Sequence, residues 1–166
     1  MKYLFLLLCS IPFLVSAQDC GLKKEIDQFS QQPKISTGFL KFGSANGRVS
    51  LDMVADSKEI KLLFTAGEGV CFDENSFASF SFEGTKTKTK QKNYSTMNCE
   101  GIFTIVFRNV ATTPFALQKI AQKKVLSIVL TDNSEKEIVL SFKPEEQEWL
   151  SAKAGCIISE AKTLIK

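Results

Sequence analysis

The chain has 166 residues, with 21 basic and 18 acidic residues and no histidine, which gives a formal net charge of +3 at pH 7. Such a small net charge does not suggest a nucleic-acid-binding protein. The lack of histidine excludes the Ser-His and Cys-His nucleophile arrangements and the common histidine metal sites.

Residues 1–17 have the pattern of a secretory signal peptide. One lysine precedes an apolar run too short to span a bilayer, and the run ends in the small residues Val15, Ser16 and Ala17. A lipid anchor at Cys20 is the alternative, but Gln18 and Asp19 stand where small residues would precede a lipidated cysteine. We therefore expect a secreted or periplasmic protein whose single mature domain, residues 18–166, has no transmembrane segment.

The cysteines left in the mature domain indicate two disulfide bonds. An even number remains in an oxidising setting, at Cys20, Cys71, Cys99 and Cys156. Of the three possible pairings we favour Cys71 with Cys99, which bracket one hairpin region, and Cys20 with Cys156, which would tie the two terminal segments together. A zinc site is the alternative, but the chain has no Cys-x-x-Cys motif. The sequence thus predicts no metal and no cofactor.

The segment that follows the signal peptide predicts a short helix. Asp19 can cap this helix, and residues 31–33 end it at a proline. Its apolar positions fall at helical spacing, at Leu22, Ile26 and Phe29.

Beyond this helix the apolar period changes to two, which is typical of half-buried strands. The strands are expected at 35–42, 48–55, 60–64, 77–82, 85–92, 101–107, 124–131 and 135–142. Pro114 opens a short helix with Leu117 and Ile120 on one side, and Pro144 opens a final helix in which Gly155 marks a bend or a close backbone contact. The fold class is therefore α+β, with an antiparallel sheet curled into a sandwich or partly open barrel and flanked by N-terminal, middle and C-terminal helices.

Residues 85–92 read TKTKTKQK, a strict alternation of threonine or glutamine with lysine. With Glu83 and Gly84 as a two-residue loop, Phe82 would face Thr85 and Phe80 would face Thr87 in a hairpin. The simpler explanation is a solvated strand face whose lysines prevent edge-to-edge pairing. The alternative is an anion-binding strip in which a nearby tyrosine stacks on a sugar, with the candidate residues Lys86, Lys88, Lys90, Lys92 and Tyr94.

Four acidic residues are candidates for two-carboxylate glycosidase chemistry, namely Asp52, Asp56, Asp73 and Glu74. The favoured explanation is that they occupy turns and strands, because such residues are common there. The chain has no phosphate loop, dinucleotide fingerprint or nucleophile elbow, so we assign no catalytic residue. The tripeptide at 93–95, Asn-Tyr-Ser, fits a glycosylation sequon.

Several short motifs carry a resemblance to known proteins. They are CGLKKEIDQF at 20–29, ISTGF at 35–39, NCEG at 98–101, and a strand followed by an acidic helix near the C-terminus. In these features the chain resembles small secreted proteins of unassigned function from Bacteroidota. The resemblance implies export and a shared fold, and it transfers no catalytic residue.

The sequence favours a non-enzymatic exported domain that binds a cell-envelope component, either an anionic glycan or an envelope protein. Two alternatives remain. The 14 phenylalanines could line a pocket for a small apolar ligand inside the curled sheet, or the carboxylates could serve a hydrolase.

Overall fold

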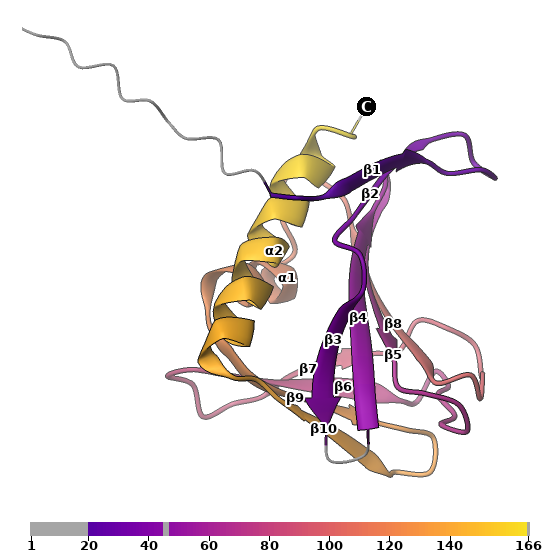
Figure 1. The fold of residues 1–166 in the computed structure, drawn as a ribbon, viewed down its shortest axis with the longest axis vertical. Coiled ribbons are helices and arrows are strands. Elements are labelled where there is room, and N and C mark those ends of the chain that lie inside the picture. Colours follow the sequence, from indigo (N-terminus) through magenta and orange to yellow (C-terminus); the bar gives the residue numbers. More distant parts are fainter. Residues whose placement is uncertain (1–19, 45–46, 166) are drawn as a thin grey trace, which may run out of the picture.

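The computed structural model describes residues 20–44 and 47–165, so the predicted signal peptide lies outside the described residues. This part of the chain is an α+β protein of antiparallel strands and two helices (Figure 1). The elements are β1 (Lys23–Ile26), β2 (Pro33–Ser36), β3 (Leu40–Ser44), β4 (Gly47–Ala55), β5 (Glu59–Thr65), β6 (Phe77–Phe82), β7 (Thr89–Lys92), β8 (Ile102–Arg108), α1 (Phe115–Gln122), β9 (Val125–Thr131), β10 (Glu137–Ser141) and α2 (Pro144–Lys162).

The strands form two layers that are joined at one point. One layer contains β3, β4, β5 and β8 with the β1–β2 hairpin, and the other contains β10, β9, β6 and β7. A single residue pair, Ser44 with Leu140, connects β3 to β10. In Figure 1 the strands of the second layer run across the lower ends of β3 and β4. The layers do not close into a barrel, so the sandwich form of the predicted fold class is the one adopted.

The core lies where the alternating strands meet. Residues of β5 and β8 are paired directly, for example Phe64 with Phe103, and both of these rings are 0% exposed. Phe103 also packs edge-on against Phe72, with 5.3 Å between ring centroids. These aromatic pairs belong to one continuous hydrophobic core.

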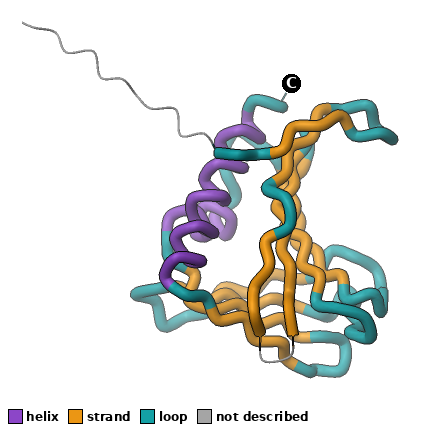
Figure 2. Tube along the Cα trace, in the orientation of Figure 1, coloured by secondary structure: helices purple, strands orange, loops and turns teal. Residues whose placement is uncertain are grey.

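Both helices lie together on one side of the strands (Figure 2). Helix α2 begins at Pro144 as predicted, and the Glu146 carboxylate accepts a hydrogen bond from the Lys143 backbone N–H at 2.8 Å. Its buried residues recur at spacings of three and four, at Leu150, Ala154, Ile157 and Ala161. Neither described helix is both long and apolar enough to cross a membrane.

The predicted N-terminal helix is wrong. Residues Lys23–Ile26 form β1, which pairs with β2, and this hairpin projects from the rest of the molecule (Figure 1). The Asp27 carboxylate accepts hydrogen bonds from Ser30 and from the Phe29 N–H, so it stabilises a turn. A helix this short gains little on its own, and strand pairing prevails.

The strand predicted at 35–42 is in fact two strands, β2 and β3, with a break at residues 37–39. Gly38 has φ +70°, outside the range of an extended strand. The Thr37 hydroxyl also accepts a hydrogen bond from the Met53 N–H at 3.0 Å. The break lets β2 and β3 pair with different parts of β4.

Both predicted disulfides are confirmed, since Cys20 is bonded to Cys156 and Cys71 to Cys99. The first fixes the start of the hairpin to α2, and the Lys153 ammonium strengthens this attachment by donating to the Cys20 carbonyl at 2.6 Å. Two disulfides are compatible with a compartment outside the cytoplasm.

Helix α2 runs through Gly155 without interruption, and a Cβ added at this position would meet open space, so the close backbone contact predicted as one alternative for Gly155 is wrong. Gly101, in contrast, occupies a position that a residue with a Cβ cannot take without strain. Its φ is +72°, and an added Cβ would collide with the backbone of Gly67.

We predict opposite stability effects for the same substitution at these two glycines. Gly155→Ala should raise the free energy of unfolding by about 0.5–1 kcal/mol, because alanine favours a helix interior. Gly101→Ala should lower it by at least ~2 kcal/mol, because the left-handed backbone and the collision add up. Urea denaturation of both variants measures the two changes. A destabilised Gly155→Ala variant would show that this position is packed after all.

Candidate functional site

The lysine-rich segment is only partly a strand. β7 covers Thr89–Lys92, and its register pairs Phe80 with Thr89 and Phe77 with Lys92. The predicted two-residue loop and register are therefore wrong, and Lys86 and Lys88 lie in the connection between β6 and β7. The reason is local. The N–H and the hydroxyl of Thr85 both donate to the Phe82 carbonyl, at 3.3 and 3.1 Å, and this turn ends the pairing with β6 until Thr89.

The register differs from the predicted one by two residues, so the alternation of faces survives. Thr89 and Gln91 are half-buried, whereas Lys90 and Lys92 are exposed. The Lys90 ammonium lies 4.3 Å from the centroid of the Phe77 ring. Phe77 and Phe80 are three residues apart in β6, so their side chains project to opposite faces of the strand. Because Phe80 is buried, Phe77 and the Lys90 ammonium beside it lie on the outer face of the β6–β7 pair.

A lysine from α1 occupies the inner face of the same strand pair. The Lys119 ammonium donates to the Thr89 hydroxyl at 3.0 Å and lies 4.4 Å from the centroid of the Phe82 ring. Phe82 is only 1% exposed, so the Lys119 side chain crosses buried aromatic surface before its charge reaches the rim. Sequence reasoning did not include this lysine, because only the fold brings α1 against β7.

A groove of about 280 Å³ lies beside Lys119, between α1 and the β6–β7 connection. Phe115, 76% exposed, stands at its wall as an aromatic surface in contact with solvent. The lining combines two cations with two amides and one hydroxyl, from Thr85, Phe115, Gln118, Lys119, Gln122 and Lys123. We call this groove, together with Lys86 and Lys88 of the adjoining connection, the α1 basic surface.

The charge of the chain is concentrated in the segment that builds this surface. Residues 84–131 contain eight basic residues and one acidic residue, Glu100, which gives a net charge of +7 for this segment. The rest of the chain is therefore net acidic, since the whole carries only +3. A charge sum over a sequence window would have found this asymmetry, whereas the net charge of the whole chain conceals it.

Tyr94 follows β7 and is 70% exposed, but it does not line the α1 groove. The preceding Asn93 is only 5% exposed. Its amide nitrogen donates to the carbonyls of Asp73 and Ser95, and its amide oxygen accepts from the Thr104 N–H at 2.9 Å. The sequon asparagine is thus a structural link between strand ends, with its amide already engaged.

The candidate carboxylates stabilise local structure. Asp56 accepts hydrogen bonds from the N–H groups of Lys58 and Glu59 in the β4–β5 turn. Asp73 accepts hydrogen bonds from Asn75 and Ser76, as expected of a residue in a turn. Desolvation acts to raise the pKa of Asp73, but these hydrogen bonds outweigh it, and the pKa is lowered from its ordinary value. Glu74 is exposed in the same turn. Within residues 20–44 and 47–165, no cluster of acidic or cysteine side chains could hold a metal ion.

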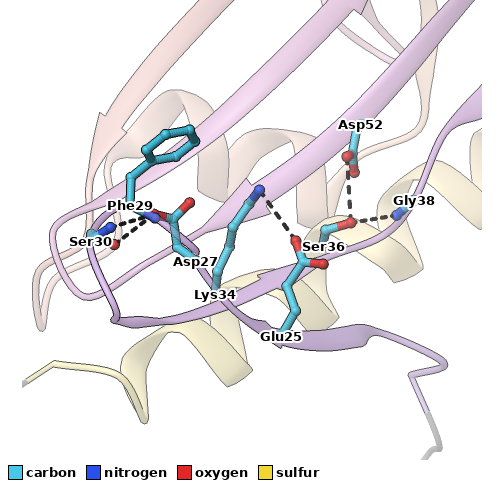
Figure 3. A network of polar contacts seen from close by, with 8 residues as sticks. All are labelled: Glu25, Asp27, Phe29, Ser30, Lys34, Ser36, Gly38 and Asp52. Atoms are coloured by element: carbon cyan, nitrogen blue, oxygen red, sulfur yellow. Dashed lines mark hydrogen bonds and ion pairs between the residues drawn. The ribbon is translucent and has the colours of Figure 1, made fainter.

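Asp52 is the carboxylate with the most unusual setting (Figure 3). Its oxygens accept from the Ser36 and Thr37 hydroxyls at 3.4 and 3.2 Å, and the Ser36 hydroxyl accepts in turn from the Gly38 N–H at 2.9 Å. Desolvation by burial raises the pKa of Asp52 above its ordinary value, against the opposing effect of these hydroxyl groups. The network holds the break between β2 and β3 against β4.

Comparison with protein families, with curated proteins and with solved structures finds no match for this chain.

We predict that Asp52→Asn changes how stability depends on pH. Because the pKa of Asp52 is raised in the folded protein, the folded state holds this proton more tightly than the unfolded state does. The free energy of unfolding of the native protein should therefore fall as pH rises from the unfolded pKa through the folded one, and the asparagine variant should lack this fall. Urea denaturation from acidic to neutral pH measures the difference, with the exposed Glu137→Gln as control. A difference that stays constant with pH would contradict the assignment.

Proposed function

We propose that this protein is an exported, non-enzymatic binding domain that recognises an anionic glycan of the cell envelope through the α1 basic surface. The observation that most supports this proposal is the groove beside α1, which is lined by Lys119, Lys123 and the exposed ring of Phe115. Cations bind sulfate, phosphate or carboxylate groups, amides bind hydroxyl groups, and an exposed ring offers a flat apolar face to a sugar.

The position of Lys119 supports recognition of a ligand over a purely solubilising role. Its ammonium is held by the Thr89 hydroxyl and by the Phe82 ring, so little conformational entropy remains to be lost when an anion binds. Lys86 and Lys88 adjoin Thr85 and Thr89 in sequence, and they extend the positive charge along the β6–β7 connection. A polyanion could therefore contact the groove and the connection together.

The proposal changes the composition of the site predicted from the sequence. Lys90 and Lys92 project from the outer face of β7, away from α1, and Lys90 is engaged with the Phe77 ring. They contribute to the electrostatic attraction of a polyanion over a longer range. The direct contacts are assigned to Lys86, Lys88, Lys119, Lys123 and Phe115.

The test uses heparin as a probe polyanion and a triple variant, Lys86→Ser, Lys88→Ser and Lys123→Ser. Among the described residues the side chains of these lysines are exposed and lie over no aromatic ring, so the core should remain intact. The affinity should fall by between about threefold and about a hundredfold, since three exposed ion pairs are lost and each contributes roughly 0.2–1 kcal/mol. Calorimetric titration at low and at physiological salt measures it, and binding of the native protein should weaken with salt.

A matched control separates a local site from overall charge. The triple variant Lys58→Ser, Lys136→Ser and Lys162→Ser removes the same charge from exposed lysines elsewhere. If both triple variants lose affinity equally, the binding follows net charge and the proposed site is wrong. If the native protein does not bind heparin or other sulfated and uronic polysaccharides at low salt, the proposed function is wrong.

A further inference from the structure

A second surface groove is lined by residues that lie apart in sequence from those of the α1 basic surface. It has a volume of about 480 Å³ and runs between β3 and the first turns of α2. Its lining is rich in aromatic rings, from Phe39, Leu40, Lys41, Phe42, Glu145, Glu146 and Trp149. A volume of this size and a mainly apolar lining are typical of ligand sites.

An open strand edge borders this groove. One edge of β3 pairs with β4 along its whole length, from Leu40 to Ser44. On the other edge, the only pairing to a described strand is that of Ser44 with Leu140. The edge of β3 from Leu40 to Gly43 therefore has backbone N–H and C=O groups without a strand partner, and such an edge can accept an added strand.

The side chains of β3 alternate along this edge. Leu40 and Phe42 are 7% and 3% exposed and face the interior, whereas Lys41 between them is exposed. Phe42 is held edge-on by Phe142 and by Trp149, at centroid distances of 4.9 and 6.4 Å. Phe39, just before the strand, is 67% exposed and lines the same groove.

We propose that this groove binds an extended peptide that adds as a strand to the free edge of β3. Main-chain hydrogen bonds to β3 would supply affinity, and alternate side chains of the peptide would enter the groove beside Phe42 and Trp149. Residues directly opposite each other in a ladder project to the same face. The peptide residues opposite Leu40 and Phe42 must therefore be apolar.

Charge complementarity defines the rest of the motif. The peptide residue opposite Lys41 projects outward beside its ammonium, which favours an acidic residue there. On the α2 wall the Glu146 carboxylate is already bound to the Lys143 N–H, while Glu145 is exposed and can pair with a basic residue that flanks the strand. The expected ligand is an apolar–acidic–apolar segment followed or preceded by a basic residue.

The test uses Trp149 as its reporter, because it is the only tryptophan of the chain and it lines the groove. The probes are capped peptides of the pattern Leu-Glu-Leu-Lys and Lys-Leu-Glu-Leu, with valine and phenylalanine versions of each. Saturable shifts in tryptophan emission are expected. Two N-methylated analogues, one for each alternating set of peptide nitrogens, keep every side chain. The analogue whose methylated nitrogens face β3 cannot form the ladder and should bind about tenfold more weakly or worse.

A charge exchange tests the register. Lys41→Glu should weaken binding of the Leu-Glu-Leu peptides several-fold and should strengthen binding of Leu-Lys-Leu peptides, because the pair opposite position 41 is restored with reversed sign. Lys58→Glu, which is remote from the groove in sequence, should change neither. If no probe binds saturably, or if both N-methylated analogues bind as well as their parents, strand addition at β3 is wrong. The result is independent of heparin binding, since the two sites share no residue.

Discussion

The rest of the structure depends on β4, because this one strand pairs with three others. Residues Gly47–Leu51 pair with β3, Ser50–Ala55 with β5, and Val54 and Ala55 with β2. Its inward side chains are at most 1% exposed, at Val49, Leu51, Met53 and Ala55. A strand with partners on both edges and one fully buried face has its register fixed, since a slip of one residue would bring Asp52 into the core.

The same arrangement leaves several strand edges without a partner strand, and these edges differ in the residues that they present. An antiparallel two-fold pairing of β7 with a second copy must place residues of the same face opposite each other, so its lysines would meet lysines. This edge is therefore protected against self-association by like charge. The edge of β3 instead borders the groove beside the first turns of α2.

The sequence predicted the elements whose signals are local and strong. The period-two pattern of β5, β6 and β8 and the proline at the start of α2 each agree with the buried face that the structure shows. The disulfide pairing was also predictable, because few pairings exist for four cysteines. The prediction failed where tertiary contacts compete with local signals: Ile26 and Phe29 have helical spacing, yet they are 58% and 98% exposed in a hairpin. The spacing of apolar side chains alone does not reveal whether the fold provides a surface against which they can be buried.

The candidate site shows a second limit of sequence reasoning. Alternation along TKTKTKQK gave the correct faces of β7 but could not place α1, so it joined Lys90 to a surface on the opposite side of the strand pair and omitted Lys119. The structure also explains why alternation alone could not separate a solvated face from a binding surface. Lys90 and Lys119 each lie over an aromatic ring, so each serves packing as well as charge, and replacing either one would change both. No such ring contact among the described residues involves Lys86, Lys88 or Lys123. Replacing these three lysines therefore removes charge without removing packing, so an effect on binding can be distinguished from an effect on stability.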